Sequence, residues 1–327
     1  MTHARFLSIR IAAVAAAAAM PAGALADDLI VTGESGILQT IDLDTGTVGH
    51  LGVCTGSVRS MAVADGTLYL GVHFGDVHRF DLATNRVVGT FNVPADNSAM
   101  AWDGQRLIVG DSDRKIHFVN PDTGAVEQTI SNLGTDVTAI GVDSGGLFVG
   151  GQSSLALRAH IGQTSFDFFA ACGSFINAMA FGPDTMYLGG SAFGGSVGTV
   201  YKFDKFVGGV NYAGTFPTPN NASAVLAHAG RIYVGGSDGM IHEMDPATGA
   251  VLRSFDMFLP VTGIAPADGL VSCPADYDVS GGLDFFDIAR FIDLFTQHLP
   301  AADTNGDGVH DFFDVQRYID LFNTGCP

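Results

Sequence analysis

Basic residues are scarce in this chain of 327 residues, which carries 15 Lys and Arg against 34 Asp and Glu. The formal net charge is −19 at pH 7, so the surface has few cations with which to neutralise phosphate groups. Nucleic acids and anionic membranes both require such cations. The composition therefore argues against either of them as a partner.

After residue 26 the chain also lacks a hydrophobic run of about 20 residues, the length that spans a bilayer. The apolar run at residues 11–20 is shorter; it follows a basic head with Arg5 and Arg10 and precedes Ala-Leu-Ala at 24–26. This layout is typical of a secretory signal peptide with cleavage after Ala26. We expect residues 1–26 to be removed and the mature protein to be secreted, either extracellular or associated with a cell surface.

Glycine, in contrast, is abundant, with 43 residues, nearly twice its usual share of about 7%. A short apolar strand that ends in small residues recurs about every 40 residues, a period typical of β-propellers. This strand occurs at residues 29–33, 68–72, 107–111, 147–151, 186–190 and 232–236. We therefore predict an all-β six-bladed propeller over residues 27–269.

The repeats are offset from the ends of this region. The chain begins with the second strand of a blade, and its last unit, 261–269, has the pattern of an inner strand. This strand is expected to pair with 29–33 and close the ring, which removes exposed sheet edges. The repeats resemble WD, YVTN and quinoprotein-like propellers, and this resemblance is specific for the fold without implying an activity.

Few side chains in the repeats suggest catalysis. Equivalent places in the six units hold Gln39, His78, His117, Arg158, Tyr201 and His242. Because each belongs to a different blade, they cannot all lie about 2 Å from one metal ion, and packing between blades is the expected role. Arg59 and Asp136 are the charged residues expected near the axis. No nucleophile motif stands out, and Trp102 is the only tryptophan on which a quinone cofactor could stack. The ring is expected to bind rather than to catalyse.

Two of the four cysteines fall in the repeats. Cys54 and Cys172 each precede a Met of an inner strand, Met61 or Met179, by seven residues. They therefore occupy equivalent places three blades apart, on opposite sides of the channel mouth. Two interpretations follow: a disulfide across the mouth, made by loops that reach inward, or two buried thiols.

The composition changes abruptly after Gly269. Residues 273–327 contain ten Asp, no Glu and two basic residues, and residues 276–295 are repeated 27 positions later as 303–322. Each copy opens with oxygen-bearing residues at positions 1, 3, 5, 7, 9 and 12, the spacing of an EF-hand calcium loop. The expected ligands of the first ion are Asp276, Asp278, Ser280, the Gly282 carbonyl, Asp284 and Asp287. Those of the second are Asp303, Asn305, Asp307, the Val309 carbonyl, Asp311 and Asp314.

The twelfth ligand is Asp, one helix follows each loop, and the chain ends in Gly325-Cys326 and a proline. These features resemble the GC-type, type I-like dockerins. The resemblance covers residues 273–327 and implies a small all-α domain over 270–327 with two loop-helix repeats and two calcium ions. It also implies docking into a cohesin-like domain on a scaffold or surface. Ser280 at position 5 and His310 at position 8 depart from the usual pattern.

The helices that follow the loops have two apolar stripes each. Residues at helical spacing predict a face that packs into a small core: Phe285, Ile288, Phe291, Ile292 and Phe295, then Phe312, Val315, Ile319 and Phe322. A second stripe is predicted to bind the partner, since aromatic and Arg side chains dominate interfaces: Phe286, Arg290 and Leu294, then Phe313, Arg317 and Leu321. The alternative is that the adjacent Phe residues are buried in a larger core.

Cys273 and Cys326 bracket this region, and a bond between them would stabilise a domain with little core by about 4 kcal/mol on the chain-entropy model. The sequence as a whole predicts a secreted, non-catalytic binding propeller that is anchored through a calcium-dependent module. The ligand of the propeller is not specified by these patterns. The alternative is an extracellular glycan-active hydrolase or lyase that the same module targets.

Overall fold

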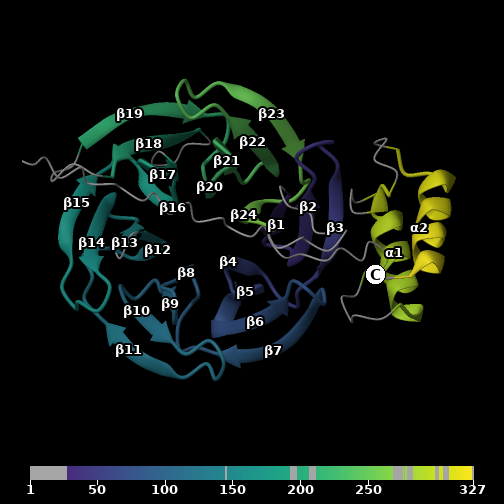
Figure 1. Ribbon diagram of the computed structural model, residues 1–327, viewed down its shortest axis with the longest axis horizontal. Coiled ribbons are helices and arrows are strands. Elements are labelled where there is room, and N and C mark those ends of the chain that lie inside the picture. The colour runs from purple at the N-terminus through teal and green to yellow at the C-terminus, as the bar shows by residue number, and fades with distance from the viewer. Residues whose placement is uncertain are drawn as a thin grey trace, which may run out of the picture.

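The structure is a computed structural model, and it describes residues 28–143, 146–191, 197–205, 211–267, 275, 277, 283–298, 302–304 and 309–325. In this part of the chain six four-stranded sheets form a ring, and two α-helices lie beside it (Figure 1). The six-bladed propeller predicted from the repeats is confirmed.

Each sheet is one blade, described here from the axis outwards. Blade 1 consists of β24 (Val261–Pro266), β1 (Leu29–Gly33), β2 (Ile37–Ile41) and β3 (Val48–Val53); blade 2 of β4 (Val58–Ala64), β5 (Thr67–Val72), β6 (Asp76–Asp81) and β7 (Arg86–Asn92); blade 3 of β8 (Ala99–Trp102), β9 (Leu107–Gly110), β10 (Ile116–Val119) and β11 (Val126–Ile130). Blade 4 consists of β12 (Val137–Asp143), β13 (Gly146–Gly151), β14 (Leu155–His160) and β15 (Asp167–Ala171); blade 5 of β16 (Phe175–Phe181), β17 (Thr185–Ser191), β18 (Gly198–Asp204) and β19 (Asn211–Thr218); blade 6 of β20 (Ala224–His228), β21 (Arg231–Gly235), β22 (Met240–Met244) and β23 (Val251–Asp256).

Blade 1 is built from both ends of the propeller sequence. Strand β24 pairs antiparallel with β1, with Leu29 opposite Pro266 and Val31 opposite Ile264. The two ends of the repeat region therefore close the ring by hydrogen bonds, as the offset of the repeats predicts (Figure 1). The pairing covers the inner edge of β1, which would otherwise be exposed.

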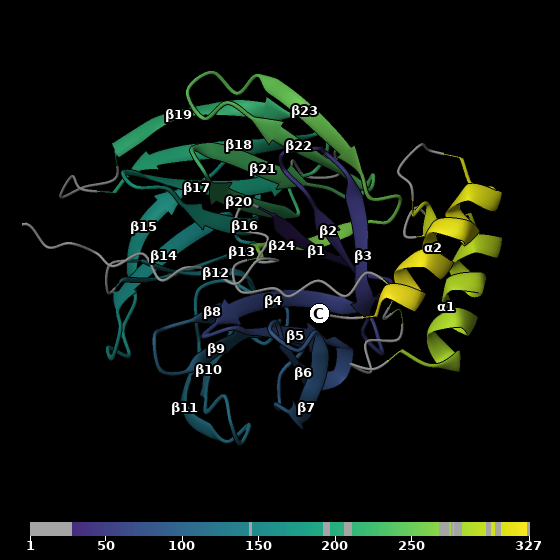
Figure 2. The ribbon, with the colours of Figure 1, turned by 45° about the vertical axis from the view of Figure 1, so that its right-hand side comes forward.

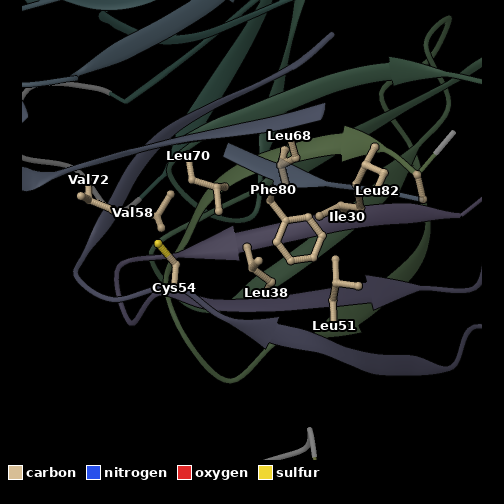
Figure 3. Packing of buried hydrophobic residues seen from close by; sticks show 11 residues of the cluster. Ile30, Leu38, Leu51, Cys54, Val58, Leu68, Leu70, Val72, Phe80 and Leu82 are labelled. Atoms are coloured by element: carbon tan, nitrogen blue, oxygen red, sulfur yellow. The ribbon is translucent and has the colours of Figure 1, made fainter. Parts of the chain in front are cut away.

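The core lies between neighbouring blades. Phe80 of β6 is fully buried and packs with Ile30 and Leu38 of blade 1 and with Leu68 and Leu70 of its own blade (Figure 3). The second strand of each blade reads as a continuous apolar run because both of its faces are covered, as in the wholly buried β1. Truncation of such a Phe to Ala costs about 3–5 kcal/mol.

Hydroxyl groups at the start of four inner strands join neighbouring blades. The Oγ of Ser98 donates to the carbonyl of Val137 at 2.6 Å, and the Oγ of Ser223 donates to that of Val261 at 2.7 Å. Thr138 donates to Ile176 at 2.5 Å and Thr262 to Val58 at 2.9 Å in the same way. The last of these bonds links blade 1 to blade 2, so the set runs around the channel.

The helices are α1 (Phe285–Thr296) and α2 (Phe312–Thr324), which lie side by side in both views (Figures 1 and 2). Asp284 and Asp311 cap them, and each begins with a capping box completed by the Asp at the third helical position. A single 3-10 turn, η1 (His73–Gly75), joins β5 to β6. No helix in the described ranges has the length and apolar character that crossing a bilayer requires.

The helical pair packs on blade 1. Tyr277, Phe291, Leu294 and Tyr318 form a buried cluster with Ile37, and Val53 and Leu259 of the propeller contact the same cluster. His50 of β3 stacks on Tyr277 with ring centroids 4.7 Å apart. The helices and the propeller therefore share one hydrophobic contact, and Figure 2 shows the helices beside the β3 edge of the ring.

Candidate functional site

Half of the twelve expected calcium ligands lie within the described residues. In the first loop Asp284 and Asp287 are described, whereas Asp276, Asp278, Ser280 and Gly282 lie outside the described residues. In the second loop Asp303, Val309, Asp311 and Asp314 are described, and Asn305 and Asp307 are not. Within the described ranges no three His, Cys, Asp or Glu side chains gather into a metal-binding group.

The ninth and twelfth positions of the two loops have the same geometry. Oδ1 of Asp284 accepts a hydrogen bond from the Phe286 N–H at 2.7 Å, and Oδ2 of Asp287 accepts one from the Asp284 N–H at 2.7 Å. In the second copy Asp311 and Asp314 accept the equivalent bonds at 2.8 and 2.9 Å. Asp287 and Asp314 are completely buried, which an ionised carboxylate tolerates only with hydrogen bonds or a cation. The described expected ligands therefore offer oxygen atoms, the hard ligands that calcium prefers.

The predicted partner stripe is only partly exposed. Phe286 and Phe313 are 64% and 63% exposed, and Arg317 is exposed as well. Leu294, however, is completely buried, and Leu321 is half-buried in the same cluster. The expectation that the leucines line an exposed binding surface is wrong, because they face the core that the helices share with Tyr277.

The predicted core face also needs correction. Phe291, Ile288 and Phe295 do pack in the core, but Phe285 and Ile292 are more than half exposed. In the second copy Phe312 is 70% exposed and Ile319 is 50% exposed. The core face is centred on Phe291, and at about 100° per residue Ile292 and Phe285 lie on its flanks. Four Phe rings are therefore exposed in two adjacent pairs: Phe285 with Phe286 and Phe312 with Phe313.

The cysteines of the propeller are two buried thiols. Cys54 lies in the core between blades 1 and 2, and Cys172 lies in the core between blades 4 and 5. Burial raises the pKa of each thiol to about 12, which keeps both protonated and unreactive. The disulfide across the mouth is not formed, and the buried-thiol interpretation is correct. Cys273 and Cys326 lie outside the described residues.

The three histidines at equivalent places in the repeats, His78, His117 and His242, each form a hydrogen bond within their own blade. Nδ1 of His78 lies 2.8 Å from Thr90 Oγ1, and Nδ1 of His242 lies 2.8 Å from Ser254 Oγ. His117 makes the same contact with Thr129 at 3.0 Å. Each hydroxyl stands directly opposite its histidine on the outermost strand. For these three of the six equivalent residues, the structure shows a cross-strand hydrogen bond inside a blade in addition to the packing expected between blades.

The channel is lined by a mixture of polar and apolar side chains of the inner strands. Its cavity of about 140 Å³ is bounded by the inner strands, with Arg59 on one side and Asn177, three blades away, among the lining residues. Arg59 pairs with Asp96 at 3.1 Å, and Asp136 pairs with Arg114 at 3.1 Å. The repeats single out Arg59 and Asp136 but not their partners, which lie in turns of neighbouring blades with no repeating pattern.

No protein-family model and no curated protein matches the chain. Among solved structures it is similar to the computationally designed protein Ika8, with a TM-score of 0.48 and 16% sequence identity. The match covers 72% of this chain and 73% of the designed one.

Proposed function

We propose that this is a secreted, non-catalytic binding propeller that is attached to a surface or complex through a calcium-dependent, dockerin-like module at residues 270–327. The observation that carries the proposal is the repeated geometry at the start of the two helices. In both copies a buried Asp at loop position 12 is followed along the helix by a core residue and preceded by two exposed Phe rings.

Calcium is supported by the two buried carboxylates. Asp287 and Asp314 occupy the position that in an EF-hand loop turns its carboxylate onto the ion. Their burial, together with six expected oxygen ligands per loop, is the arrangement in which a divalent cation relieves repulsion between carboxylates. We expect two ions for each chain.

Docking is supported by the four exposed Phe rings. Phe285 and Phe286 lie with ring centroids 6.1 Å apart, and Phe312 and Phe313 lie 6.3 Å apart. Exposed apolar side chains that gather on one small module are typical of a protein interface. These residues stand at loop positions 10 and 11, which help to choose the cohesin in the dockerins that the module resembles.

The test is binding of the mature chain to immobilised, purified cohesin-type domains in calcium and in chelator. We expect at least one domain to bind in calcium and to release the chain in chelator. Replacement of Phe286 and Phe313 by Ala should weaken binding at least tenfold, a loss of about 1.4 kcal/mol. The control is Phe168→Ala, which removes an equally exposed ring from β15 of the propeller. Binding that persists in chelator contradicts the proposal.

A further inference from the structure

One inner strand breaks the hydroxyl pattern around the channel with a charged residue. Four blades place a hydroxyl at this position: Ser98, Thr138, Ser223 and Thr262. Blade 5 has the neutral Asn177 there. Blade 2 has Arg59 instead, and the bond to blade 3 is made by the next residue, Ser60, whose Oγ donates to the Asn97 carbonyl at 2.7 Å. A departure from a repeat that is compensated beside it is typical of a functional position.

Arg59 belongs to a cluster drawn from three segments. Its Nη1 lies 3.1 Å from Oδ2 of Asp96, in the turn from β7 to β8, and 3.1 Å from Nε2 of His73, in η1. A guanidinium only donates, so Nε2 accepts and the imidazole proton is on Nδ1, which lies 3.5 Å from Oδ1 of Asp96. The three side chains are between 32% and 47% exposed, so oriented donors and acceptors remain open to a ligand.

An aromatic ring stands beside this cluster. Phe74 is 86% exposed, and its ring centroid lies 4.6 Å from that of His73. Its φ of +70° is in the left-handed region, which is unfavourable for a bulky residue. The turn is nevertheless fixed, because the Asn92 amide donates to the Phe74 carbonyl at 3.2 Å and Gly75 lies against the Val93 carbonyl. Strained residues that the surroundings hold in place are typical of ligand sites.

A groove of about 390 Å³ runs from Phe74 past Pro94 to the turn between β9 and β10, a volume in the range of small-ligand sites. The carboxylates of Asp96, Asp111 and Asp113 line it, and each already has a partner. The partners are Arg59 for Asp96, His117 for Asp111 at 3.2 Å, and Lys115 for Asp113 at 3.2 Å. The groove thus offers oriented acceptors, and cationic side chains balance the charges of Asp96 and Asp113.

We infer that this groove, at the junction of blades 2 and 3, binds a neutral oligosaccharide. Adjacent hydroxyls of a hexose would hydrogen-bond to Asp96 in the groove, and the C–H face of the sugar would stack on Phe74. Arg59 lines the channel cavity and would hold the Asp96 carboxylate in place through their ion pair. Carboxylates that already pair with a cation favour a neutral sugar over a positively charged amino sugar. The net charge of −19 disfavours a negatively charged uronic acid. The inference rests on the proposed function, because it names the ligand class of the binding propeller.

The experiment is titration calorimetry of the mature full-length chain, in calcium, with hexasaccharides. The neutral probes are the hexamers of β-1,4-glucose, α-1,4-glucose and β-1,4-mannose, and the charged probes are those of galacturonic acid and glucosamine. We expect at least one neutral probe to bind. Phe74→Ala should weaken it about fivefold, the loss expected for one aromatic contact. Arg59→Ser, which introduces a hydroxyl residue like those of four other blades, should also weaken binding, and Phe74→Tyr should preserve it.

The matched control is Phe168→Ala, which should leave the affinity unchanged. No binding of any neutral probe at millimolar concentration overturns the inference, and so does binding of the charged probes alone or equal affinity of Phe74→Ala and the parent. Repeating the titration in chelator separates the two proposals. Sugar binding that persists in chelator, while docking is lost, supports both proposals. Calcium-dependent docking without sugar binding contradicts only the inference about the oligosaccharide.

Discussion

The rings of Phe291 and Tyr318 stack face to face, with centroids 4.1 Å apart and planes 7° from parallel. The two residues occupy equivalent places in the duplication, 27 positions apart. Tyr277 meets both rings edge-on, at 5.6 and 5.2 Å. The duplicated helices therefore pack on each other through the same residue, and the propeller is reached through the tyrosine that precedes the first helix.

Phe291 should be the most sensitive position of the helical pair. Phe291→Ala removes a buried ring that contacts both tyrosines, and we expect it to destabilise the pair by about 3–5 kcal/mol. Hydrogen exchange of the helix amides measures the effect. The neighbouring Ile292→Ala is the control, because Ile292 is half exposed. Equal effects of the two substitutions would show that the face assignment is wrong.

His50 should make the contact between propeller and helices sensitive to acid. Burial is the main cause that lowers its pKa to about 4, and nearby Arg290 adds to this, while the hydrogen bond with the Tyr277 carbonyl opposes it. Between pH 6.5 and 4 the unfolded chain binds a proton at His50 that the folded chain does not. Stability is therefore lost as the pH falls through this window, by up to roughly 3 kcal/mol at pH 4.

Urea unfolding of the parent and of His50→Gln at pH 7 and at pH 4.5 measures this loss. The variant removes the titrating group, so its stability should fall less between the two pH values than that of the parent. Parallel losses would mean that other groups control the acid sensitivity.

Cys54 and Cys172 should be unreactive toward a thiol reagent at pH 8 in the folded protein. Both are buried, and burial raises the pKa of each to about 12. In denaturant without reductant we expect two thiols per chain if Cys273 and Cys326 are bonded to each other. A rapid reaction of the folded protein would contradict the buried positions, and four thiols would exclude the expected bond near the C-terminus.

Thr262→Val should weaken the closure of the ring. The substitution keeps the shape of the side chain but removes the hydroxyl that donates to Val58 at 2.9 Å, leaving that carbonyl without this donor. We expect a loss of about 1–3 kcal/mol in urea unfolding. Thr164→Val, at an exposed turn position, serves as control, and a Thr262→Val stability equal to the control would show that the bond does not support the ring.

The propeller could be predicted from the sequence because its signal is repeated six times and each strand's burial follows from its own residues. The hydroxyl bonds and the Arg59–His73–Asp96 cluster could not, since each joins a side chain to a group on another strand or turn, and the repeat pattern does not show which groups are placed in contact. The helix faces were misassigned for another reason. The helices carry more aromatic residues than a small core can bury, so apolar spacing alone did not show which of them face outward.

Calcium titration calorimetry of the mature chain tests the central claim most directly. We expect two ions to bind, with a gain in helical circular dichroism. Asp287→Asn and Asp314→Asn, which preserve shape but remove a buried carboxylate charge, should each reduce the stoichiometry to one or weaken one site at least tenfold, about 1.4 kcal/mol. No heat of binding at millimolar calcium would contradict the account and remove the basis for calcium-dependent attachment.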